Sequence, residues 1–216
     1  MRIKDKIKRP RRPVVAYEIL PPREKDGTLN SYAENISSLL SQTHIDAINI
    51  PEVRDEVARG ERPIKNQVRA EPREFGRLLQ DIVGIEAIVN RVVVHQNIDE
   101  EMKWLEETNL KYEIENLITV GGESRDIRYP GPTVNQALNA ISQNDRLNLL
   151  CGGISIPSRD RESLRLIEKS ENGSEFFTTQ VLYDASKVIK MITHYQKRCD
   201  VKNTFPRRVL LSFAPV

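Results

Sequence analysis

Short apolar runs alternate with amphipathic stretches from residue 14 to residue 216. Seven of the runs have the length and the branched or aromatic residues of β-strands, and they cover residues 14–20, 47–51, 87–95, 112–120, 147–155, 176–183 and 209–216. Between these runs, apolar residues recur at the spacing of one helical face, as Ile36, Leu39 and Leu40 do within residues 32–40. The same spacing predicts helices in the later intervals, around Phe75, Leu78, Leu79 and Ile82, around Met102 and Leu105, around Val134, Leu138 and Ile141, around Leu164 and Ile167, and around Val188, Ile189 and Ile192.

Strand–helix alternation indicates a parallel sheet, because parallel neighbours need a long crossover between them. Two architectures fit this pattern: the closed (β/α)8 barrel of TIM type and the open doubly wound sheet. The open sheet carries a Gly-x-Gly-x-x-Gly turn after its first strand, whereas Pro21-Pro22-Arg23 stands there in this chain. We therefore expect an α/β fold, a (β/α)8 TIM-type barrel of which seven strands are seen, formed by residues 14–216 as a single domain.

The seventh predicted strand ends with the sequence, so such a barrel lacks its last helix–strand–helix portion. The first and seventh strands would then have unpaired edges, which natural proteins avoid. Three explanations stay open at this point. The sequence is a fragment, or a second copy or a partner chain completes the barrel, or the sheet is open at that seam.

The composition fits a soluble globular protein, with 38% hydrophobic and 30% charged residues. No apolar run approaches the ~20 residues that cross a bilayer, and the amino terminus lacks the apolar core of a signal peptide. Cys151 and Cys199 are the only cysteines, which favours neither a disulfide framework nor a zinc cluster, and no metal-binding spacing is present. We expect a cytoplasmic protein without a membrane partner and without a metal site.

Charge is distributed unevenly along the chain. The formal net charge is +2, but residues 1–13 hold seven basic residues and one acid, a charge of +6, which leaves −4 for residues 14–216. We expect residues 1–13 to form a basic, solvated tail. Nucleic-acid binding is disfavoured, because the rest of the chain is mildly acidic and shows no basic face interleaved with aromatic residues.

Glu18 is the one ionisable residue in the first apolar run. A carboxylate inside a buried strand loses its hydration, which raises its pKa toward the range useful for a general acid. Glu18 is therefore a candidate catalytic residue. The alternative is a strand residue that faces solvent or pairs with an arginine.

Other polar residues follow the predicted strands, at the end of a barrel where chemistry takes place. Glycine pairs, at Gly121-Gly122 and at residues 152–153, would let the backbone approach a ligand, although tight turns explain them equally well one at a time. Gln180 interrupts an apolar strand, so its amide needs either a partner across the sheet or a polar ligand. His95 follows three valines and, taken alone, is typical of a core histidine.

Three stretches together resemble the methylenetetrahydrofolate reductase family of flavin-dependent barrel enzymes. They are residues 17–23 (Tyr-Glu-Ile-Leu-Pro-Pro-Arg), residues 177–184 (Phe-Thr-Thr-Gln-Val-Leu-Tyr-Asp) and residues 212–216 (Ser-Phe-Ala-Pro-Val), which resemble the family's first, sixth and seventh strands. The Gly-Gly-Glu turn at residues 121–123 and the Ile-Pro-Ser-Arg segment at residues 156–159 agree in spacing. The resemblance covers residues 14–216.

The resemblance implies an activity. NADH or NADPH would reduce a bound FAD, which in turn reduces 5,10-methylenetetrahydrofolate to 5-methyltetrahydrofolate. Glu18 matches the glutamate that supplies a proton to N10 of the folate, and Gln180 matches a residue that contacts the folate. Glu123 matches an acid near both the flavin and the pterin.

The resemblance also implies a flavin site. His95 matches a histidine that contacts the flavin, and Lys169 matches a basic residue near the flavin phosphates. Gly121 and Gly122 belong to the same turn as Glu123, and the three are expected to border the flavin.

The chain departs from the family at the flavin site. Well-known members read Arg-Gly-Asp where Gly121-Gly122-Glu123 stands here, and Glu162, Arg165 and Glu168 replace other polar residues. Two further hypotheses therefore stay open: a non-catalytic or partner-dependent barrel that binds folate or flavin in one-carbon metabolism, and a different barrel enzyme, such as a lyase or a corrinoid-linked methyltransferase.

Overall fold

The computed structural model describes residues 1–9, 12–53, 68–123 and 126–214. Seven parallel strands form one sheet in the order β1 to β7, and their bounds are β1 Ala16–Glu18, β2 Ala47–Pro51, β3 Ala87–Val92, β4 Asn116–Val120, β5 Leu150–Ser155, β6 Phe176–Val181 and β7 Arg208–Ser212. The helices are α1 Ile3–Lys8, α2 Leu29–Leu40, α3 Pro72–Val83, α4 Ile98–Leu110, α5 Val134–Ser142, α6 Glu162–Glu171 and α7 Ala185–Val201, with a short 3-10 helix at Glu24–Asp26.

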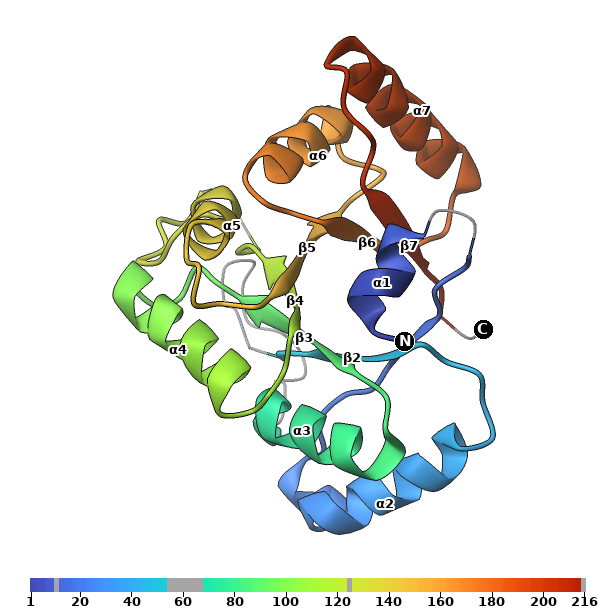
Figure 1. Cartoon of the computed structure of the whole chain (residues 1–216), viewed down its shortest axis with the longest axis vertical. Helices are drawn as coiled ribbons and strands as arrows, with labels where there is room; N and C mark the ends of the chain where they lie inside the picture. Colours follow the sequence, from blue (N-terminus) through green and yellow to red (C-terminus); the bar gives the residue numbers. More distant parts are fainter. Residues whose placement is uncertain (10–11, 54–67, 124–125, 215–216) are drawn as a thin grey trace.

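The sheet curls into an incomplete barrel, and α2 to α7 surround its outside (Figure 1). Each strand pairs in parallel with the next one along the chain, from β1 through to β7. The sheet order places β1 and β7 at its two edges, so in the described part of the chain the barrel is open between them. The predicted α/β barrel with seven visible strands is therefore confirmed.

Six of the seven strands differ from their predicted bounds at one or both ends, and the third and fourth do so for local reasons. The fourth strand begins at Asn116 rather than at residue 112, because Glu113 has a left-handed φ of 51° and the chain turns there. The third strand ends at Val92, so that His95 lies in a turn beyond it.

Alternate residues of the strands point into the barrel and form its inner core. The amino-terminal part of this interior is closed by α1, whose Ile3 and Ile7 are 1% and 6% exposed. They join a cluster contributed by successive strands: Ala47, Ile88, Ile118, Leu150 and Phe176. Residues 3–8 of the predicted solvated tail are thus a helix packed on the barrel.

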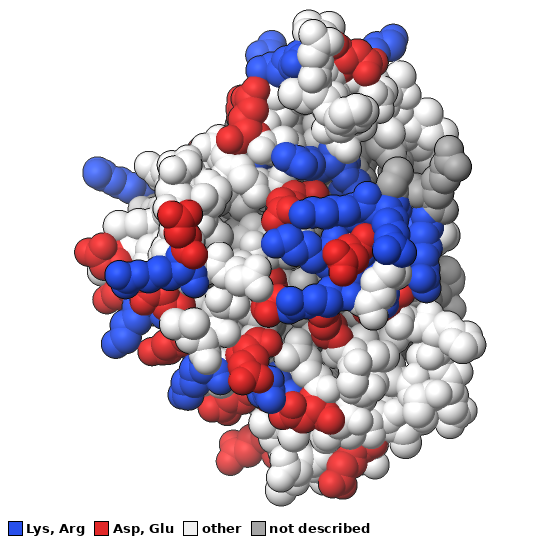
Figure 2. Space-filling model, in the orientation of Figure 1, with Lys and Arg blue, Asp and Glu red and all other residues white. Residues whose placement is uncertain are grey.

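The basic residues around α1 have acidic partners that immediately precede strands. The ion pairs join Arg2 to Glu86 and Glu115, Lys6 to Asp46 at 2.9 Å, and Lys8 to Glu175 at 3.9 Å. The guanidinium of Arg208, at the start of β7, donates to the carbonyls of Lys6 at 3.1 Å and Arg12 at 2.7 Å. Figure 2 shows Lys and Arg side chains gathered in this region, and Arg2, Lys6 and Lys8 among the basic residues form ion pairs with the barrel rather than a free tail.

A buried ion pair joins the sheet to the outer helices. Arg91 on β3 is 2% exposed, and its guanidinium donates three hydrogen bonds of 2.7–3.1 Å to the carboxylate of Glu101 on α4, which is fully buried. The same guanidinium lies 4.3 Å from the ring centroid of Trp104 and donates to Glu52 at 2.9 Å.

No helix among the described residues combines the length and the apolar character needed to cross a membrane.

Candidate functional site

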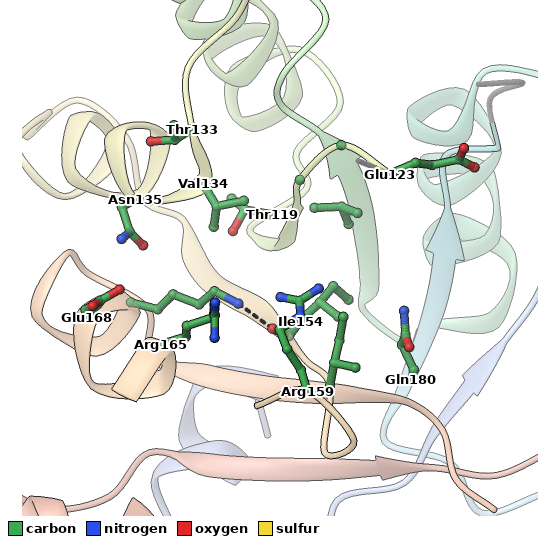
Figure 3. A pocket seen from close by; sticks show the side chains of 15 residues that line it. Thr119, Glu123, Thr133, Val134, Asn135, Ile154, Arg159, Arg165, Glu168 and Gln180 are labelled. Carbon is green, nitrogen blue, oxygen red and sulfur yellow. Dashed lines mark hydrogen bonds between the residues drawn. The ribbon is translucent and has the colours of Figure 1, made fainter. Parts of the chain in front are cut away.

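A cavity of about 830 Å³ opens at the carboxyl-terminal ends of β4 and β5. The amino-terminal end of α5 and the inner side of α6 complete its walls, through Thr133, Asn135, Arg165 and Lys169. Figure 3 shows these walls, with Arg165, Glu168 and Asn135 on one side of the view and Glu123 and Gln180 on the other. This is the end of a parallel barrel where ligands bind, because the loops after the strands converge there.

The α6 side of the cavity is cationic. Lys169 extends along β5 and its Nζ donates to the carbonyl of Ile154 at 2.5 Å. Burial lowers the pKa of the Lys169 ammonium, because the charged form has lost most of its hydration. Arg159 and Arg165 also line the cavity, and Arg165 is oriented by a hydrogen bond of 2.8 Å to the carbonyl of Asp160. Glu168 lies on the same side, so the three cations outnumber the single acid there and favour a ligand with phosphate or carboxylate groups.

The opposite side of the cavity presents a carboxylate and an amide, from Glu123 and Gln180. The sequence predicted a buried amide at Gln180, and this was wrong: the side chain is exposed. The reason is an irregularity in the β6–β7 pairing between Thr178 and Val181, after which the last residues of β6 leave the packed interior.

The glycine pairs have packing reasons that the sequence did not reveal. A Cβ on Gly122 would stand 2.2 Å from the ring of Tyr129, and one on Gly152 would stand 2.5 Å from the ring of Phe176. Gly121 also borders the cavity, and a Cβ there would be in ordinary contact with Val134 at 3.4 Å. The need for glycine at residues 122 and 152 is thus set by neighbouring rings.

His95 lies near this turn but does not line the cavity. Its ring packs edge-on against Tyr129 with 5.6 Å between the ring centroids. Because Tyr129 in turn covers Gly122, His95 is linked to the cavity wall through one aromatic ring.

Glu18 lies apart from the cavity lining as well. All three residues of β1 are exposed, so the burial predicted for Glu18 was wrong. The cause is the open seam, because among the described residues β1 has a sheet neighbour on one side only. The Glu18 carboxylate accepts a hydrogen bond of 2.8 Å from the amide of Asn49, its register partner on β2.

The structure brings five of the seven predicted site residues to one cavity: Gly121, Gly122, Glu123, Lys169 and Gln180. Among the residues that the sequence analysis missed is Asn90, which is 9% exposed and lies inside the barrel. Its signal was present in the sequence, because Asn90 follows Ile88 by two residues and so shares its inward face.

No family model and no curated protein matches the chain. Among solved structures, a Clostridium thermocellum protein described as uncharacterized and as binding two copies of 5-methyl-5,6,7,8-tetrahydrofolic acid aligns with a TM-score of 0.75 and 20% identity, over 96% of this chain and 68% of that one. A monomeric dihydrodipicolinate synthase variant aligns with a TM-score of 0.55 and 16% identity, over 93% and 62%. A Burkholderia cenocepacia putative lyase/mutase aligns with a TM-score of 0.54 and 10% identity, over 92% and 77%. At these identities the similarity establishes the barrel fold that this chain shares with them.

Proposed function

We propose that this protein binds a reduced folate at the carboxyl-terminal end of its barrel and, with bound FAD, reduces 5,10-methylenetetrahydrofolate at the expense of NADH or NADPH. The observation that carries the proposal is the convergence of Glu123, Gln180 and Lys169 on one cavity, as the family resemblance implies. The similarity in fold to a protein described as binding 5-methyltetrahydrofolate supports the same ligand class.

The cavity fits a flavin dinucleotide in its chemistry. Arg165 and Lys169 supply cations for the phosphates at one end, and Gly121 leaves one wall without a side chain. Its volume of about 830 Å³ lies within the range typical of cofactor sites. When bound there, FAD would supply hydride transfer between the nicotinamide and the folate.

The residues at the other end would act on the folate. Gln180 can donate to and accept from the pterin edge, and Glu123 can accept from its ring nitrogens. Glu18 would hold the proton that N10 of the folate receives when the five-membered ring opens. Folate bound at the mouth of the barrel would cover Glu18 and remove water from it.

A non-catalytic folate-binding barrel is the second candidate, and one observation favours it. Glu18 is exposed and does not line the cavity that holds Glu123 and Gln180. A chain that bound folate without placing Glu18 against N10 would bind ligand and fail to reduce it.

An absorbance spectrum after incubation with FAD and desalting tests the flavin part. We expect flavin bands near ~450 nm that bleach with NADH or NADPH, weakened by Lys169→Met, because one phosphate-facing cation is lost. The matched control is Lys190→Met, which removes an exposed lysine from α7. Wild-type protein that retains no flavin would refute the reductase proposal.

Calorimetric titration with 5-methyltetrahydrofolate tests the folate part. We expect Gln180→Ala to weaken binding about tenfold or more, because a buried ligand group loses its hydrogen-bond partner. Gln143→Ala, at an exposed position after α5, is the control. Binding that is normal in Gln180→Ala would remove this residue from the folate site.

A further inference from the structure

Two oppositely charged side chains of α6 hold the end of β5. Lys169 donates a hydrogen bond of 2.5 Å to the carbonyl of Ile154, drawn as the dashed line in Figure 3. Glu162 accepts a hydrogen bond of 3.1 Å from the backbone N–H of Ile156. Glu162 precedes Lys169 by about two turns of the helix, so both lie on one face of α6. Because Ile154 and Ile156 line the cavity, this face of α6 fixes the backbone of the cavity wall.

The carboxylate of Glu162 is buried, and one of its oxygens lacks a hydrogen bond. The residue is 2% exposed, and its Oε2 accepts no hydrogen bond from the described part of the chain. Nη1 of Arg159 lies 3.7 Å from this oxygen, which makes an ion pair but is too long for a hydrogen bond. A buried carboxylate is costly unless it is paired and hydrogen-bonded, although its place in the first turn of a helix offsets part of the cost. The remaining cost points to a role beyond packing.

Glu162 closes the loop that carries Arg159 to the cavity. The loop begins at Ile156, directly after β5, and ends at Arg161, directly before α6. Arg161 has a left-handed φ of 55°, which residues other than glycine seldom adopt. The hydrogen bond from Ile156 to Glu162 joins the two ends of the loop, and within it the N–H of Arg159 donates to the carbonyl of Ile156 at 2.9 Å. A loop tied at both ends holds Arg159 at the cavity wall, where its side chain is 40% exposed.

We infer that Glu162 is a positioning residue for the anionic group of the ligand, and that it acts through Arg159. The closed loop holds the guanidinium of Arg159 at the same cavity as the ammonium of Lys169, so a phosphate or carboxylate group meets cations that are already ordered. The reach of the Glu162 side chain provides this order, whereas its negative charge opposes an anion nearby. The inference rests on the proposed function, in which cations of this wall hold the flavin phosphates.

Calorimetric titration with pyrophosphate separates the reach of Glu162 from its charge. Glu162→Asp keeps the charge but is shorter by one methylene, so it cannot accept from the N–H of Ile156 unless the loop moves. We expect it to weaken pyrophosphate binding about tenfold, because the ligand must then order Arg159 itself. Glu162→Gln keeps the length and an acceptor oxygen, so it should bind pyrophosphate at least as tightly as wild-type protein. Glu74→Asp, at an exposed position in the first turn of α3, is the control for the shortening.

An Arg159→Met background shows whether the effect passes through Arg159. Arg159→Met should weaken pyrophosphate binding by itself, and adding Glu162→Asp should then cost little more, since the cation that the loop presents is gone. A general disturbance of the fold would instead weaken binding equally in both backgrounds. Three results would overturn the inference: Glu162→Asp that binds like wild-type protein, Glu162→Gln that loses as much as Glu162→Asp, or a loss that persists in the Arg159→Met background.

The outcome for the proposed function is separate. Wild-type protein that binds pyrophosphate but retains no flavin would refute the reductase proposal, and the comparison of the Glu162 variants would stand. Wild-type protein that retains flavin, together with Glu162→Asp that binds pyrophosphate normally, would overturn the role of Glu162 alone. Wild-type protein that binds no pyrophosphate would overturn the anionic subsite and, with it, the role of Glu162.

Discussion

Removal of one partner from the ion pair between β3 and α4 should destabilise the protein strongly. Glu101→Leu leaves the guanidinium of Arg91, which is 2% exposed, without its main partner. Breaking a buried pair in this way costs about 3–5 kcal/mol. Because Glu52 still accepts from Arg91 at 2.9 Å, we expect the lower limit, about 3 kcal/mol. In a chain of 216 residues this corresponds to a decrease in Tm of about 6–12 °C.

Trp104 provides the assay, because it is the only tryptophan and its ring lies 4.3 Å from the Arg91 guanidinium. Urea unfolding followed by its fluorescence should show the lost stability, and Arg91→Met combined with Glu101→Leu should recover part of it. The control is Asp81→Asn, in the exposed Arg77–Asp81 pair, which should cost no more than about 0.5 kcal/mol. A Glu101→Leu variant as stable as this control, or a double variant no more stable than Glu101→Leu, would refute the reasoning.

Three further predictions concern the barrel interior and the cavity. Gly152→Ala should lower the free energy of unfolding by about 1–3 kcal/mol, because the new Cβ would stand 2.5 Å from the ring of Phe176. Adding Phe176→Leu should restore part of that loss, and denaturant titration can measure both effects. Burial lowers the pKa of Lys169, so between that lowered pKa and the ordinary pKa of lysine the folded state binds fewer protons at Lys169 than the unfolded state. Within that pH window the stability of wild-type protein relative to Lys169→Met should rise as the pH rises, and a flat difference would contradict this. Burial raises the pKa of the Cys151 thiol to about 12. When native protein is treated with iodoacetamide at pH 8, a peptide map should therefore show Cys151 unmodified, and rapid labelling would contradict its burial.

The sheet could be predicted from the sequence because its central strands are buried on both faces. Residues 47–51 show this best, since the predicted bounds are those of β2. A strand buried on both faces is rich in apolar residues, as Ile48 and Ile50 are on either side of Asn49, so the apolar run marks the strand. The first strand was the least predictable, because the exposure of its residues depends on whether another strand lies beside it.

The candidate site could be predicted in part for a similar reason. Glu123 follows β4 and Gln180 lies near the carboxyl end of β6, and strand ends in a parallel sheet meet at one edge. The sequence could not show that Tyr129 covers Gly122, because that contact depends on how the loop between β4 and α5 folds back. It also could not show that Asn49 pairs with Ile88 and Asn90 with Pro51, since this depends on strand register.

The packing of α1 has a consequence for the order in which the chain folds. The Arg208 guanidinium reaches the carbonyl of Lys6 across 202 residues of sequence, and Ile3 and Ile7 belong to a buried cluster with residues of β2 to β6. Closing so long a loop is slow, and a ribosome delivers residue 3 well before residue 208. Helix α1 is therefore synthesised before the strands on which it packs, and until β2 to β6 have emerged its two isoleucines remain open to chaperones and to other nascent chains.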